Sequence, residues 1–127
     1  MVKSSIIFAP ISVGELFDKL TILQIKKDKL KGSKLKNINK EIYYLEEVLK
    51  SNNLFVDDKI FSELKTINNN LWNIEDEIRV KESKSEFDSD FIKLARSVYF
   101  ENDKRASLKK EINIKYKSEL IEEKSYK

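Results

Sequence analysis

Two opposite charges interrupt the apolar face of the last long helical segment that the sequence predicts. That face has helical spacing and consists of Phe91, Leu94, Val98, Leu108, Ile112 and Tyr116, and Glu101 and Arg105 occupy its middle. A charge between packed helices is unfavourable by several kcal/mol unless it is paired and hydrogen-bonded. Glu101 precedes Arg105 by four residues, which is the favourable order for an ion pair within a helix. We therefore expect these two side chains to pair.

Antiparallel helices joined by short turns would place further polar residues at the level of this pair. The resulting polar layer consists of Thr21, Gln24, Asn68, Glu101, Asn102 and Arg105. One interpretation is a buried network that fixes the register of the helices. A second is that Arg105 binds an anionic ligand, because its planar guanidinium grips carboxylate or phosphate through two hydrogen bonds. A protein interface is the third.

Four carboxylates could serve a different chemistry. Glu15 and Asp18 lie three residues apart near the start of the first predicted helix, and Glu75 and Asp76 lie on the third. All-α hydrolases build sites for Mg²⁺ or Mn²⁺ from such carboxylates on facing helices. The antiparallel geometry puts the two pairs about two to three turns apart, so that they would meet only across a dimer interface. Acidic residues at helix starts are also typical caps and dipole partners.

Composition excludes several function classes. The 127 residues contain no cysteine and no histidine, which rules out disulfides, thiolate zinc sites, Cys nucleophiles and His bases. A net charge of +3 does not indicate a nucleic-acid or membrane partner. No segment approaches the roughly 20 apolar residues of a membrane span or the core of a signal peptide, so we expect a cytoplasmic protein.

Four helices should position these residues within a single domain. Residues 1–10 are expected to form an extended arm, in which Ile6, Ile7 and Phe8 form a short strand or lie across the bundle. Residues 11–117 should form the helical domain, and residues 118–127 a charged tail. The first predicted helix runs from the Ser12 cap to about residue 31, just before Gly32, and the second from Ser33 to about residue 51. The third runs from about residue 57 to the turn that starts at residue 81. The fourth runs from about residue 88 to about residue 117.

These elements predict an all-α fold. The third helix carries the cleanest heptad-like repeat, and the short connections favour an antiparallel bundle of four helices with coiled-coil-like packing. The alternative is a pair of long hairpins that complete their cores only in a dimer. The first helix is apolar on several sides, which suits either arrangement.

Several sequence strings together resemble a known family. They include residues 9–16, 18–23, 71–79, 91–99, 102–106 and 122–126, which read APISVGEL, DKLTIL, LWNIEDEIR, FIKLARSVY, NDKRA and EEKSY. The chain resembles a family of small, functionally uncharacterised proteins from proteobacteria and marine phages. The resemblance implies no activity. It marks matching polar positions, which are Glu15, Asp18, Lys19, Thr21, Glu75, Asp76, Arg79, Arg96, Asn102, Asp103 and Arg105.

The sequence thus supports two functional hypotheses. The first is a non-enzymatic helical protein without a cofactor, a homodimer that binds another macromolecule or a small anion. Its ligand-binding candidates are Lys19, Thr21, Gln24, Asn68, Arg96, Asn102 and Arg105. The alternative is a small all-α protein that hydrolyses or binds a nucleotide or nucleotide sugar, with Mg²⁺ or Mn²⁺ held by Glu15, Asp18, Glu75 and Asp76.

Overall fold

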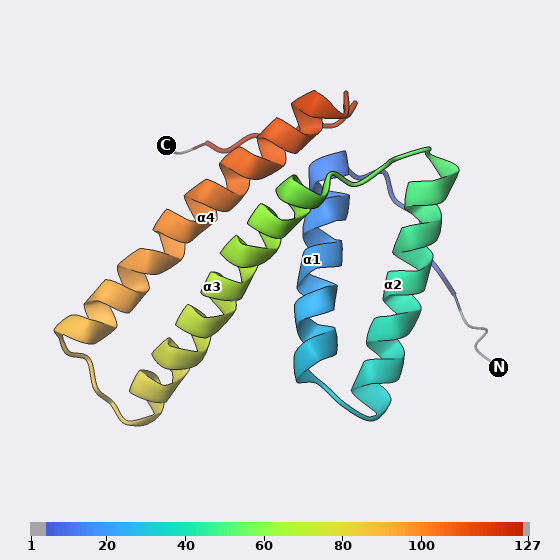
Figure 1. Ribbon diagram of the computed structural model, residues 1–127. Coiled ribbons are helices and arrows are strands. Elements are labelled where there is room, and N and C mark those ends of the chain that lie inside the picture. The colour runs from blue at the N-terminus through green and yellow to red at the C-terminus, as the bar shows by residue number, and fades with distance from the viewer. Residues whose placement is uncertain (1–4, 126–127) are drawn as a thin grey trace.

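The predicted all-α fold is confirmed. The computed structural model describes residues 5–125, which form four α-helices and no strand (Figure 1). The helices are α1 (Val13–Lys29), α2 (Ser33–Ser51), α3 (Asp58–Ser83) and α4 (Ser89–Lys115). They form two antiparallel hairpins, α1–α2 and α3–α4. Residues 1–4 and 126–127, which belong to the predicted arm and tail, lie outside the described part of the chain.

Three helices start where a side chain caps them. The Ser12 hydroxyl accepts a hydrogen bond from the Glu15 amide, and the carboxylates of Asp57 and Asp88 cap α3 and α4 in the same way. Contrary to the prediction from sequence, Gly32 does not directly follow the end of the first helix. The first helix already ends at Lys29, and Gly32 is the N-cap of α2 with a φ of 70°, a conformation that favours glycine.

The first helix is the centre of the fold. It packs against each of the other three helices, whereas α2 packs against α1 alone (Figure 1). One core cluster joins α1 to the α3–α4 hairpin and consists of Phe17, Leu64, Leu108 and Ile112. A second cluster joins α1 to α2 and consists of Leu23, Ile38 and Ile42. This position explains why the sequence of α1 is apolar on several sides.

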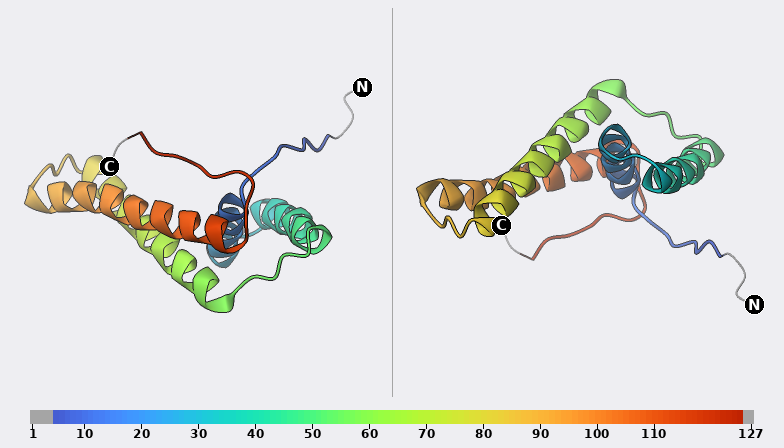
Figure 2. Two further views of the ribbon diagram at one scale, coloured as in Figure 1. Left: turned by 90° about the horizontal axis from the view of Figure 1, so that it is seen from above. Right: turned by 90° about the horizontal axis from the view of Figure 1, so that it is seen from below.

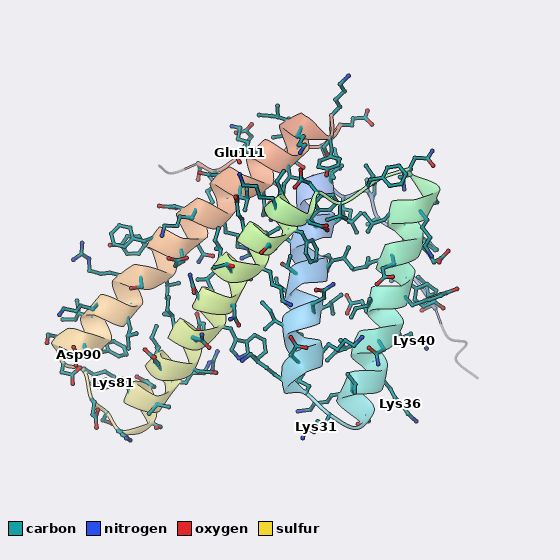
Figure 3. All side chains as sticks on the ribbon, in the orientation of Figure 1. Lys31, Lys36, Lys40, Lys81, Asp90 and Glu111 are labelled. Carbon is teal, nitrogen blue, oxygen red and sulfur yellow. The ribbon has the colours of Figure 1, made fainter. Side chains whose placement is uncertain are left out.

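The α3–α4 hairpin extends beyond the core. No residue between Asn68 and Leu108 is buried, so the far half of the heptad-like seam is only half-covered. The ammonium group of Lys81 lies 3.3 Å from Glu86 and 2.9 Å from Asp88, and these ion pairs close the turn at the tip (Figure 3). The α3–α4 hairpin therefore projects from a small core.

The two terminal segments behave differently from each other. Ile6, Ile7 and Phe8 neither form a strand nor lie across the helices, but point away from the body of the molecule (Figure 2). The C-terminal segment instead turns back along α4 (Figure 2), where Glu122 and Glu123 pair with Lys109 and Lys110 at 3.5 and 3.7 Å.

Candidate functional site

A buried carboxylate, Asp18, organises the polar residues at the junction of α1 with the second hairpin. Its side chain is only 1% exposed. Arg105 of α4 donates to it through two nitrogens, Nε to Oδ1 at 2.9 Å and Nη2 to Oδ2. Asn68 of α3 donates to Oδ1 at 2.8 Å. The hydrogen bonds that Arg105 donates to Asp18 raise the pKa of the guanidinium above its ordinary value.

Neighbouring side chains complete the network. The Thr21 hydroxyl accepts a hydrogen bond from Asn68 at 2.7 Å and donates one to the Asp18 carbonyl at 2.7 Å. Asn102 accepts a longer hydrogen bond, 3.5 Å, from Nη1 of Arg105. We call Asp18, Thr21, Asn68, Asn102 and Arg105 the Asp18 network. It ties three helices together and satisfies the buried carboxylate, as a buried charge requires.

The predicted pairing of Glu101 with Arg105 is wrong. Arg105 turns to Asp18, because the Asp18 side chain is the more deeply buried of the two carboxylates and would be strongly unfavourable without a cation. Glu101 pairs instead with Lys104 at 3.1 Å, and its side chain is 14% exposed. Its second oxygen, Oε2, is buried and accepts no hydrogen bond. Glu101 therefore pairs within its own helix, and its unsatisfied Oε2 makes it an unfavourable interruption of the seam.

The polar face of α4 continues for two turns beyond Arg105. Lys109 contacts Glu15 at 2.6 Å, lies 3.9 Å from Asp18 and reaches Glu122 of the C-terminal segment. One turn further, the Asn113 side chain accepts a hydrogen bond from the Gly14 amide at 2.6 Å. Lys109 and Asn113 were not among the predicted site residues, although they follow Arg105 in two successive steps of four residues, which places all three on one helix face.

Two cavities open on either side of Arg105 and Asn102. The larger, about 460 Å³, lies between α1, α3 and α4, and we call it the three-helix groove. Its apolar lining consists of Ile22, Ile25, Leu71 and Trp72, and its polar lining of Asn68, Glu75, Asp76, Arg79, Asn102 and Arg105. The smaller pocket, about 260 Å³, lies under the C-terminal segment, whose Glu122 and Glu123 line it together with Lys109 and Lys110.

Comparison with known proteins places the chain in a family. Residues 7–127 match a family of unknown function over nearly the whole sequence. The chain belongs to DUF6165. The predicted resemblance to an uncharacterised family is thereby confirmed, and the family description assigns no activity. No curated protein and no solved structure matches the chain. No helix in residues 5–125 of this DUF6165 protein is long and apolar enough to cross a membrane.

The predicted ligand-binding candidates of this DUF6165 chain separate into two groups. Thr21, Asn68, Asn102 and Arg105 come together in the Asp18 network. The other three lie elsewhere. Gln24 lines a cavity between α1 and α2, and Lys19, which follows Asp18 directly in the sequence, lies on another side of α1. Arg96 is exposed on α4, and its guanidinium lies 5.6 Å from the Phe100 ring.

The predicted metal candidates do not gather at one place. Asp18 pairs with Arg105, Glu15 with Lys109, and Glu75 lies 3.9 Å from Arg79, while Asp76 is exposed on α3. Within residues 5–125 no group of three or more acidic side chains is placed to hold a metal ion. A magnesium or manganese site remains a prediction that the positions of these carboxylates do not favour.

Proposed function

We propose that this DUF6165 protein is a non-enzymatic binding protein, and that its ligand is a small monoanion with a flat or apolar body. The proposed site is the three-helix groove. The observation that carries the proposal is that Arg105 is both paired with Asp18 and partly exposed in the groove. Asp18 holds one edge of the guanidinium rigidly, while the side chain remains 29% exposed and lines the groove. A pre-organised guanidinium with free N–H groups binds a carboxylate at little further entropic expense.

The lining of the groove sets the ligand's chemistry. Asp18 offsets the charge of Arg105, and the exposed Glu75 and Asp76 offset that of Arg79. These five groups together carry one negative charge, so the groove does not attract a polyanion, and a single carboxylate would bind through hydrogen bonds from Arg105 rather than through net charge. Trp72 and the aliphatic residues of α1 offer an apolar surface beside the guanidinium, so the rest of the ligand should be flat or apolar.

Binding is a better proposal than catalysis for this groove. The chain has no histidine or cysteine. The carboxylates of the lining, Glu75 and Asp76, are exposed and neighbours on one helix, so they do not form the facing pair that general acid–base chemistry or metal binding needs.

The single tryptophan of the chain provides a direct test, because Trp72 lines the groove. We expect benzoate to change Trp72 fluorescence saturably, and its neutral counterpart benzyl alcohol and the polyanion pyrophosphate to have little effect. Adenosine monophosphate tests the nucleotide alternative. Asn102→Ala and Arg79→Gln should each weaken benzoate binding, by roughly tenfold if a charge-assisted hydrogen bond of about 1.5 kcal/mol is lost.

Arg96→Gln is the matched control, because Arg96 is an exposed arginine of α4 outside the groove. Its benzoate titration should superimpose on that of the unmodified protein. No saturable fluorescence change with benzoate, or an equal change in the Asn102→Ala and unmodified proteins, would contradict the proposal.

We also propose that the protein works as a homodimer. Two features support this: α2 packs on α1 alone, and the projecting α3–α4 hairpin contains no buried residue over its outer half. In a closed bundle each helix would be covered by two neighbours. Light scattering from micromolar to about 100 µM protein tests the proposal, and a monomeric mass throughout would refute it.

A further inference from the structure

The extended segment before α1 exposes an unusual amount of apolar surface. Ile7 and Phe8 are 88% and 85% exposed, and Ile6 beside them is half-exposed. Residues 4–14 carry no charged side chain, although 37% of the chain is charged. Three consecutive large apolar residues in water are unfavourable, so this segment is suited to burial against another apolar surface. We call Ile6–Phe8 the arm.

An apolar cavity of fitting character lies between α1, α2 and the linker that joins α2 to α3. Its volume is about 580 Å³, and its apolar lining includes Leu20, Leu49, Leu54, Val56 and Phe61. Phe55, at the linker edge of the cavity, is itself 83% exposed. We call this cavity the linker groove. Nothing in residues 5–125 fills it.

The arm does not reach the linker groove of its own chain. Figure 2 shows the arm leaving α1 on one side of the α1–α2 layer and the α2–α3 linker crossing on the other. Only four residues lie between Phe8 and the start of α1 at Val13, so the two are at most about 17–18 Å apart when the segment is fully extended. The arm would have to pass around a helix to enter the groove beside it. The groove of a second molecule has no such obstruction.

We infer that two copies of the chain exchange arms, with the Ile6–Phe8 arm of each copy occupying the linker groove of the other. This inference rests on the proposed homodimer and names its contact surfaces. Exchange of a terminal segment between identical chains gives two equal contacts and a closed pair. The uncharged arm matches the apolar part of the groove lining, and the charged residues of that lining, Glu46, Lys50 and Asp58, are exposed to solvent.

Cysteine cross-linking tests the contact without background, because the chain has no cysteine of its own. Phe8→Cys and Lys50→Cys chains are mixed and oxidised, since Lys50 lines the linker groove. We expect a covalent dimer of the two different chains. Lys36→Cys replaces Lys50→Cys in the matched control, because Lys36 is exposed at the opposite end of α2 (Figure 3). Equal cross-linking to both positions would overturn the inference.

Complementation distinguishes this inference from the wider homodimer proposal. Phe8→Asp disables the arm and Phe55→Asp the groove, and both side chains are exposed, so the single chain should fold normally. We expect each variant to raise the dimer dissociation constant by at least tenfold, and an equimolar mixture to recover dimer because one arm and one groove remain intact. Ile114→Asp, an exposed residue of α4 outside both surfaces, should leave the constant unchanged.

Each result has a defined meaning. A dimer that both aspartate variants leave unchanged would refute arm exchange and leave the homodimer proposal standing. A monomer in light scattering would refute both. Loss of dimer in each variant without recovery in the mixture would also refute arm exchange, because it would mean that the two residues act in one continuous surface.

Discussion

Replacing Arg105 by alanine should destabilise the protein strongly through its effect on Asp18. The buried carboxylate would lose both hydrogen bonds from Arg105 and keep the one from Asn68. Breaking a buried ion pair by removing one partner typically lowers the free energy of unfolding by about 3–5 kcal/mol. Because the Arg105 side chain is 29% exposed and partly screened by solvent, we expect the lower end, about 3 kcal/mol.

Chemical denaturation with urea measures this loss. Domains of this size have a free energy of unfolding of about 5–15 kcal/mol, so a loss of about 3 kcal/mol clearly lowers the urea concentration at the midpoint of unfolding. Adding Asp18→Asn to Arg105→Ala should recover about half of the loss, because no charge then remains buried. Arg96→Ala, an exposed substitution on the same helix, should change stability by less than about 0.5 kcal/mol. A loss below about 1 kcal/mol for Arg105→Ala would refute the burial and pairing described for Asp18.

Three further predictions concern other contacts. Gly14→Ala should lower stability by about 1–3 kcal/mol in thermal or urea unfolding, although alanine normally favours a helix, because the new Cβ would lie 2.6 Å from the Lys109 carbonyl oxygen. Glu101→Leu should raise stability by about 1 kcal/mol in the same assay, since it removes the unsatisfied Oε2 from the seam. Asp57→Asn should reduce the loss of stability in acid, measured as the difference in melting temperature between pH 7 and pH 2.5.

The sign of the last prediction follows from the pKa of Asp57. Its hydrogen bond from Lys115 lowers that pKa below the ordinary 3.8. The resulting stabilisation is fully present above pH 3.8 and is lost as the pH falls through the lowered value. Asparagine caps a helix as well as aspartate, so the variant removes the charge and retains the cap of α3. An unchanged acid dependence would contradict this reasoning, and stabilisation by Gly14→Ala or destabilisation by Glu101→Leu would contradict the other two.

Local sequence patterns predicted most of the fold. The caps Ser12, Asp57 and Asp88 mark helix starts because a short polar side chain satisfies free amide groups within the next turn. The antiparallel geometry also predicted that Thr21, Asn68, Asn102 and Arg105 would lie at one level, and four members of the Asp18 network were found in this way.

Local patterns could not predict which of these polar side chains pair with each other. Asp18 and Arg105 are 87 residues apart, and their contact depends on how α1 and α4 rotate about their own axes. Spacing along one helix instead favoured Glu101, which the structure shows is not the partner. Asp18 was interpreted as a metal ligand or dipole partner because it lies near a helix start, although the packing of three helices makes that position the most buried acidic site described.

The central position of α1 has a consequence for folding during synthesis. α1 and α2 are made first and can form their own small core from Leu23, Ile38 and Ile42. The other face of α1, with Phe17 and Asp18, has no complete partner until α4 is made with Arg105 and Leu108. A nascent chain therefore carries an unpaired carboxylate beside exposed apolar surface for most of its synthesis, and we expect incomplete chains to be captured by chaperones far more readily than the finished protein.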